Sequence, residues 1–156
     1  MNIDERLVAG IVNAVLSRMG DGADSSADAD GGSCGVFESM DEAVEAAAAA
    51  QKKYLNCTMH DRAAYVQAIR DVVLDQENLS YLPRQSVEET EMGNYEHKLI
   101  KNRLAATKTP GIEDLTTEAM SGDDGLTLVE YSPFGVIGAI TPTTNPTETI
   151  ICNSIG

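Results

Sequence analysis

Apolar residues recur at helical spacing along the first twenty positions, with polar residues mostly on the opposite side. The segment that follows is rich in Asp, Gly and Ser and has almost no apolar bulk, so it cannot bury enough surface to order itself. We therefore expect an amphipathic helix over residues 1–20 and an acidic flexible linker over residues 21–35. The apolar stripe of this helix includes Ile3, Leu7, Ile11 and Val15.

Helical spacing also dominates the middle of the chain, where the globular part begins at about Val36. Ser39 followed by Glu42 is a capping-box pattern ahead of an alanine-rich run. The middle of the chain is therefore predicted to be a helical layer. Its expected helices are "SMDEAVEAAAAAQKKYL", "HDRAAYVQAIRDVVLDQ", a shorter "RQSVEETEM" between Pro83 and Gly93, and a fourth from about Tyr95 to Thr107.

The period changes after this layer. Leu126, Leu128 and Glu130 alternate, which predicts an edge or hairpin strand, and "SPFG" is a turn signal. The nearly continuous apolar run 136–140 predicts a strand that is buried on both faces. A fully apolar strand that leads into a helix is typical of a parallel sheet, so we expect an α/β fold.

The chain then enters a polar turn, "TPTTNPTE". Asn145 suits a helix N-cap, Pro146 suits the first helical position, and Glu148 completes a capping arrangement, so helix initiation alone can explain these residues. The functional alternative is a ligand site, because ligands of open α/β sheets bind where strands end. The turn has no GxGxxG pattern, but the side-chain amide of Asn145 can donate to a developing oxyanion.

Charge and cysteine usage exclude several classes of function. The net charge of -14, from 11 basic and 25 acidic side chains, disfavours nucleic acid as a partner. The three cysteines have no zinc-site spacing, and no segment is typical of a signal peptide or a membrane span, so we expect no metal, no membrane and a cytoplasmic location. One basic cluster is either a solvated helix face or a site for an anionic cofactor or RNA. It comprises Lys98, Lys101, Arg103 and Lys108.

The stretch "TLVEYSPFGVIGAITPTTNPTETIICNSI" closely resembles the aldehyde dehydrogenase superfamily where the first nucleotide-binding strand meets the active site. "TPTTNPT" is similar to the CoA-acylating branch, as are "ETEMGNYEHKLIKN" and "SGDDGLTLVEYSPFG" upstream. The resemblance covers about residues 36–156. It implies the N-terminal portion of a doubly wound, Rossmann-like cofactor domain, incomplete in this chain.

The resemblance implies an NAD-dependent oxidation of a short aldehyde, with coenzyme A as the acyl acceptor. Asn145 matches the family's oxyanion donor, and Thr141, Pro142, Thr143 and Thr144 match the turn that borders the cofactor. The family's catalytic cysteine lies far downstream of this motif, and Cys34, Cys57 and Cys152 do not match it; we interpret Cys152 as a buried inert thiol. We therefore expect this chain to be inactive alone, with its last strand and helix prone to fraying.

The order of helix, small-residue linker and enzyme resembles acylating aldehyde dehydrogenases of bacterial microcompartments. The resemblance implies that Ile3, Leu7, Ile11 and Val15 dock onto shell or cargo proteins, and that the intact enzyme is a homo-oligomer inside a microcompartment. The alternative is a non-catalytic adaptor that docks through the same helix.

Overall fold

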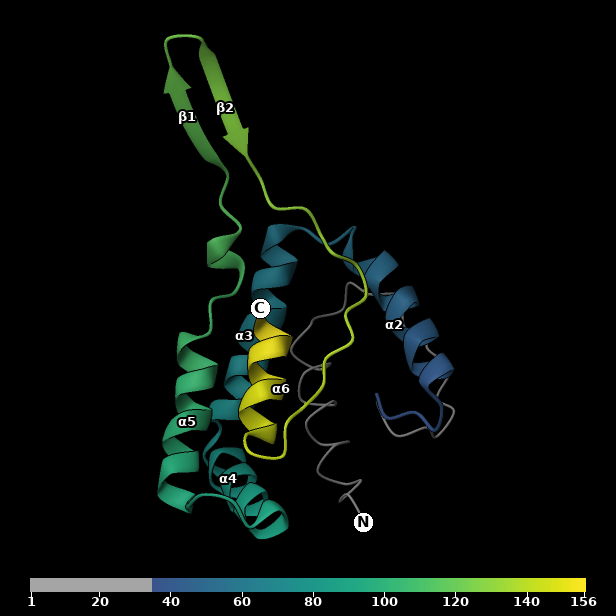
Figure 1. The fold of residues 1–156 in the computed structure, drawn as a ribbon, viewed down its shortest axis with the longest axis vertical. Coiled ribbons are helices and arrows are strands. Elements are labelled where there is room, and N and C mark those ends of the chain that lie inside the picture. Colours follow the sequence, from purple (N-terminus) through teal and green to yellow (C-terminus); the bar gives the residue numbers. More distant parts are fainter. Residues whose placement is uncertain (1–34) are drawn as a thin grey trace.

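The computed structural model describes residues 35–156, so the predicted helix 1–20 and nearly all of the linker lie outside the described residues. The described chain forms five α-helices, one short 3-10 helix and a two-stranded sheet (Figure 1). None of its helices is long and apolar enough to cross a membrane. The elements are α2 (Met40–Tyr54), α3 (Met59–Leu74), α4 (Gln76–Thr90), α5 (Tyr95–Lys108), η1 (Ile112–Asp114), β1 (Glu118–Gly122), β2 (Gly125–Val129) and α6 (Pro146–Ile155).

Four of the helices, α3 to α6, pack against one another, whereas most of α2 extends away from them and its last residue, Tyr54, contacts Arg62 and Tyr65 of α3 (Figure 1). Their shared core is small and apolar. Ala106 is 0% exposed and lies at the centre of this core, where side chains are closely packed. The buried core cluster consists of Val66 and Val73 from α3, Ala105 and Ala106 from α5, and Ile151 and Ile155 from α6.

Side-chain caps explain where α2 and α3 begin. The Glu42 N–H donates to Ser39 Oγ over 3.2 Å, which forms the Ser39 half of the predicted capping box. At α3 the box is complete: the Asp61 N–H donates to Thr58 Oγ1 over 3.2 Å, and the Thr58 N–H donates to Asp61 Oδ2 over 2.8 Å. Hydrogen bonds from the Thr58 side chain and backbone hold the pKa of the Asp61 carboxyl below its ordinary value.

The predicted helix boundary at Pro83 is wrong. The helix α4 begins seven residues earlier, at Gln76, because Asp75 Oδ1 accepts from the Glu77 N–H over 3.0 Å and from the Asn78 N–H over 3.3 Å. Pro83 lies inside the helix and is fully buried. A proline there removes one helix hydrogen bond, but burial of its ring among the packed helices offsets part of that loss.

The two strands form an antiparallel hairpin, in which Glu118 pairs with Val129 and Gly122 pairs with Gly125. The alternating run that begins at Leu126 is therefore confirmed as a hairpin strand. Both strands are exposed along their whole length, and the hairpin projects from the helices (Figure 1).

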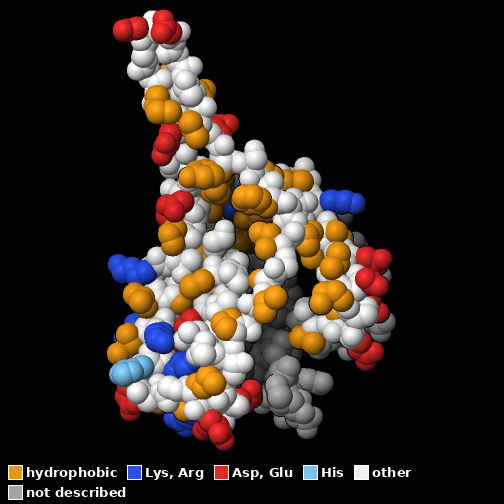
Figure 2. Space-filling view, viewed as in Figure 1, with side chains coloured by type: hydrophobic (Ala, Val, Ile, Leu, Met, Phe, Trp, Pro, Cys, Tyr) orange, Lys and Arg blue, Asp and Glu red, His pale blue; other side chains and the backbone are white. Residues whose placement is uncertain are grey.

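The predicted buried strand over residues 136–140 is absent from the described structure. This segment is irregular, and Ile140 is 94% exposed. A strand needs neighbours to pair with, and the hairpin is the only sheet within residues 35–156. Hydrophobic side chains therefore gather on the surface below the hairpin (Figure 2).

The helix after the turn, α6, is formed and contributes Ile151 and Ile155 to the core. Its expected tendency to fray stays a prediction, which hydrogen exchange would test. The α/β fold class, with a helical layer that leads into strands, is confirmed.

Candidate functional site

A groove of about 770 Å³ runs between α5 and α6, where the polar turn ends. Both helices present polar side chains to it, and the short segment after α5 borders it. The residues that line the groove are Lys101, Leu104, Ala105, Lys108, Thr109, Pro110, Asn145, Glu148, Thr149, Cys152 and Asn153.

Asn145 stands at the junction of the turn and α6. Pro146 occupies the start of the helix as predicted, and the Asn145 main-chain carbonyl accepts from the Thr149 N–H over 3.2 Å. The predicted side-chain cap is wrong, because the Asn145 side chain makes no cap bond at α6 in the described structure. Its Oδ1 instead accepts from Lys101 Nζ over 3.1 Å, and its Nδ2 lies 3.4 Å from Thr144 Oγ1.

Glu148 also departs from its predicted capping role. Its position on α6 turns it toward the packed helices, so the residue is only 8% exposed. Its Oε2 accepts from Thr147 Oγ1 over 3.0 Å, whereas its buried Oε1 has no hydrogen-bond partner within residues 35–156. The carboxyl group is therefore a buried polar element of the groove wall rather than part of a cap.

The basic cluster on α5 is divided between the interior and the surface. Lys98 is 2% exposed and its Nζ donates to the main-chain carbonyl of Thr144, so the solvated-face interpretation is wrong for this residue. Lys101, Arg103 and Lys108 are exposed, and Lys101 and Lys108 also line the groove. Helical spacing explains the difference, because Lys98 shares the buried stripe of Asn102, Ala105 and Ala106.

We did not predict from the sequence that Lys98 and Lys101 contact the turn. Their separation of three positions on one helix was the available signal, because residues so spaced lie on neighbouring parts of a helix face. Of the predicted cofactor-binding residues, the structure brings Thr144 against α5. Thr141, Pro142 and Thr143 are exposed and do not line the groove.

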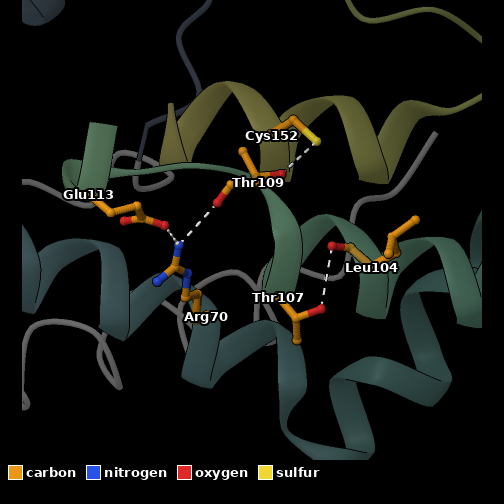
Figure 3. Close-up of polar contacts among 6 residues, drawn as sticks. All are labelled: Arg70, Leu104, Thr107, Thr109, Glu113 and Cys152. Carbon is orange, nitrogen blue, oxygen red and sulfur yellow. Dashed lines mark hydrogen bonds and ion pairs between the residues drawn. The ribbon is translucent and has the colours of Figure 1, made fainter. Parts of the chain in front are cut away.

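Arg70 fixes the segment that borders the groove (Figure 3). Its Nη2 donates to the Thr109 carbonyl and to Glu113 Oε1, each over 3.0 Å. A hydrogen bond from the backbone of Glu113 itself, followed by the Arg70 guanidinium, holds the pKa of the Glu113 carboxyl below its ordinary value. Thr109 Oγ1 also lies 3.2 Å from Cys152 Sγ, so the same segment contacts α6.

The titratable and nucleophilic groups of the described chain do not assemble a complete catalytic set. Cys152 is half-buried against the core, and Cys57 Sγ lies 3.6 Å from Tyr65 Oη, a contact that raises the pKa of Tyr65. His60 and His97 are exposed helix residues. Residues 35–156 contain no cluster of His, Cys, Asp or Glu suited to a metal. Of the two described thiols, Cys152 lines the groove and Cys57 does not.

The sequence matches the model of the aldehyde dehydrogenase family over residues 34–155. Among curated proteins, it is 51% identical over 121 residues to the CoA-propanoylating propanal dehydrogenase of Citrobacter freundii. That alignment covers 78% of this chain and 26% of the relative, so the chain spans about a quarter of the length of the protein it matches.

Solved structures give the same result. Propionaldehyde dehydrogenase of Rhodopseudomonas palustris, determined with CoA and an acylated cysteine, is 77% identical with a TM-score of 0.74, over 78% of this chain and 28% of that one. A propionaldehyde dehydrogenase from the fucose utilisation microcompartment of Clostridium phytofermentans is 56% identical with a TM-score of 0.71, over 78% of this chain and 27% of that one. The similarity to a CoA-propanoylating enzyme agrees with the CoA-acylating resemblance of the sequence. The chain belongs to the aldehyde dehydrogenase family.

Proposed function

We propose that this chain is the N-terminal part of an NAD-dependent, CoA-acylating aldehyde dehydrogenase that converts a short aldehyde and CoA to acyl-CoA. The observation that carries the proposal is the position of Asn145 at the start of α6, with its side-chain oxygen engaged by Lys101 at 3.1 Å. The similarity to CoA-acylating propanal and propionaldehyde dehydrogenases supports the reaction class.

In the proposed reaction, Asn145 stabilises negative charge on the aldehyde oxygen. A thiolate that attacks the carbonyl carbon drives electrons onto that oxygen, and a fixed amide N–H is an effective donor to it. The start of α6 adds a favourable dipole, since main-chain N–H groups at a helix N-terminus are unpaired. In this proposal the thiolate comes from another part of the whole enzyme, because none of Cys34, Cys57 and Cys152 matches the catalytic cysteine that the family resemblance implies.

The turn that precedes Asn145 is proposed to border the nicotinamide cofactor. The turn residues Thr141, Pro142, Thr143 and Thr144 are exposed, which fits a dinucleotide held along the main chain. When bound, NAD accepts the hydride from the aldehyde carbon. The role of this chain is to hold the turn in place, and Lys98 does so by donating to the Thr144 carbonyl.

A segment graft tests the proposal. Residues 36–156 replace the matching segment of the Rhodopseudomonas palustris enzyme, and NADH formation is followed with propionaldehyde and CoA, with NADP⁺ in a parallel assay. We expect turnover within about tenfold of the unmodified host, because the grafted chain supplies a complete turn and donor. We expect no turnover from the 156-residue chain alone. A folded but inactive graft would contradict the proposal and would favour the adaptor hypothesis.

We further propose that the protein is microcompartment cargo that docks through Ile3, Leu7, Ile11 and Val15, all outside the described residues. The apolar stripe in the sequence and the microcompartment origin of a similar enzyme support this. Deleting residues 1–20 is expected to abolish co-sedimentation with purified shell proteins, with replacement of Asn2 by Ser as the control. Unchanged recruitment of the deleted form would reject the docking proposal.

A further inference from the structure

Two lysines of α5 contact consecutive residues of the turn. Lys98 Nζ donates to the main-chain carbonyl of Thr144, and Lys101 Nζ donates to the side-chain Oδ1 of Asn145 over 3.1 Å. They are three positions apart on the helix, so one helix face makes both contacts. One contact therefore fixes the main chain of the turn and the other its terminal side chain.

The second contact distinguishes the two ends of the Asn145 amide. An amide has an acceptor oxygen at one end and a donor nitrogen at the other, whereas an ammonium group only donates. Lys101 can therefore pair with Oδ1 but not with Nδ2. While this pair is formed, Nδ2 must point away from Lys101, where its only polar contact within the described residues is the 3.4 Å approach to Thr144 Oγ1.

The burial of the two lysines separates their roles. Lys98 is 2% exposed, so its ammonium needs a fixed partner and the Thr144 carbonyl provides one. Lys101 is exposed and does not contribute to the core, so removing its charge leaves the packed helices intact. Lys98 is thus a structural anchor, and Lys101 can be tested without unfolding the chain.

We propose that Lys101 is a positioning residue that selects the amide orientation of Asn145 in which Nδ2 is available to a ligand. The catalytic importance of this orientation rests on the proposed function. The orientation of the amide does not, because it depends only on the contact between Lys101 and Asn145. Lys101 acts through Asn145 and does not need to touch the aldehyde.

The first test is made on the full 156-residue chain by NMR. The three-bond couplings from the Hβ protons of Asn145 to its side-chain ¹⁵Nδ2 report the rotamer about the Cβ–Cγ bond, which decides which end of the amide faces Lys101. Lys101→Met is expected to lower the preference for the observed rotamer by about fivefold, the effect of losing one hydrogen bond of ordinary strength. Lys101→Arg should restore it, because a guanidinium also only donates.

Lys108→Met is the matched control, since it removes a lysine from the same helix and the same groove without a contact to Asn145 among the described residues. It should leave the couplings unchanged. The proposal is overturned if Lys101→Met leaves them unchanged, or if Lys108→Met alters them as much.

The second test uses the grafted enzyme and separates positioning from a general structural effect. Lys101→Met should lower kcat by about fivefold with little change in the KM for aldehyde, and should have no further effect in an Asn145→Ala background. Equal losses in both backgrounds would reject positioning through Asn145. If Asn145→Ala itself has no effect, the proposed function fails while the NMR result still decides the orientation.

Discussion

Replacing Asn145 with Ala in the grafted enzyme is expected to lower kcat by about a hundredfold to a thousandfold, the usual effect of removing one oxyanion donor. The donor acts on charge that develops in the transition state, so the loss should fall on kcat rather than on the KM for aldehyde. Asn145→Gln keeps the amide but moves it by one methylene, and we expect it to fail nearly as badly. Initial rates of NADH formation at saturating propionaldehyde measure the effect.

Asn56→Ala provides the control for this measurement. Asn56 lies beyond the end of α2, is exposed and donates to the Lys52 carbonyl, so its loss removes an amide of the same kind away from the groove. Its kcat should stay within about twofold of the graft, as surface substitutions usually leave the fold intact. An Asn145→Ala graft that retained more than a tenth of the activity would show that the donor lies elsewhere.

A second large effect is expected on stability, from Ile151→Ala. Ile151 is 5% exposed and packs in the core formed by α3, α5 and α6. Truncation leaves a cavity among close-packed side chains, which should lower the free energy of unfolding by about 2–5 kcal/mol. Urea unfolding of the 156-residue chain, followed by circular dichroism at 222 nm, measures this change.

Ile150, the neighbour of Ile151, provides the control, because it is also an isoleucine. Ile150 is 56% exposed, so Ile150→Ala removes the same atoms from the surface and should change the free energy of unfolding by about 0.5 kcal/mol or less. Comparable losses at the two positions would mean that α6 does not dock on the core as described.

Helix starts and the hairpin strand were predictable from the sequence, because interactions between residues close together in the chain determine them. Ser39 caps α2, Pro146 starts α6, and the alternation from Leu126 marks a hairpin strand. Each signal acts within a few residues of itself, through a cap, a fixed backbone angle or a strand pleat. The complete box at Thr58 and Asp61 was equally visible in the sequence, and reading it would have placed the start of α3.

Tertiary contacts decided the features that the sequence did not predict. Pro83 reads as a helix boundary, but the Asp75 cap and burial of the ring keep it inside α4. Lys98 reads as a surface charge, but it is buried because the Thr144 carbonyl, 46 residues away, accepts its hydrogen bond. The apolar run 136–140 carries the pattern of a buried strand, and the described chain offers it no strand to pair with.

The position of Asn145 at the start of a helix was predictable from the sequence, but the direction of its side chain was not, since it turns to Lys101 instead of capping α6. Its role as an oxyanion donor stays a prediction. An asparagine oxygen can accept either from the main-chain N–H groups of its own helix or from a lysine ammonium. The packing of α5 against α6 is what brings the ammonium of Lys101 within reach.

The most direct test of the central claim is a crystal structure of the graft with CoA and a propanoyl group on the host's catalytic cysteine. The account predicts that Asn145 Nδ2 lies about 2.7–3.1 Å from the thioester oxygen, with Oδ1 still paired to Lys101. A thioester oxygen held by other donors, with the Asn145 amide turned away from it, would contradict the account.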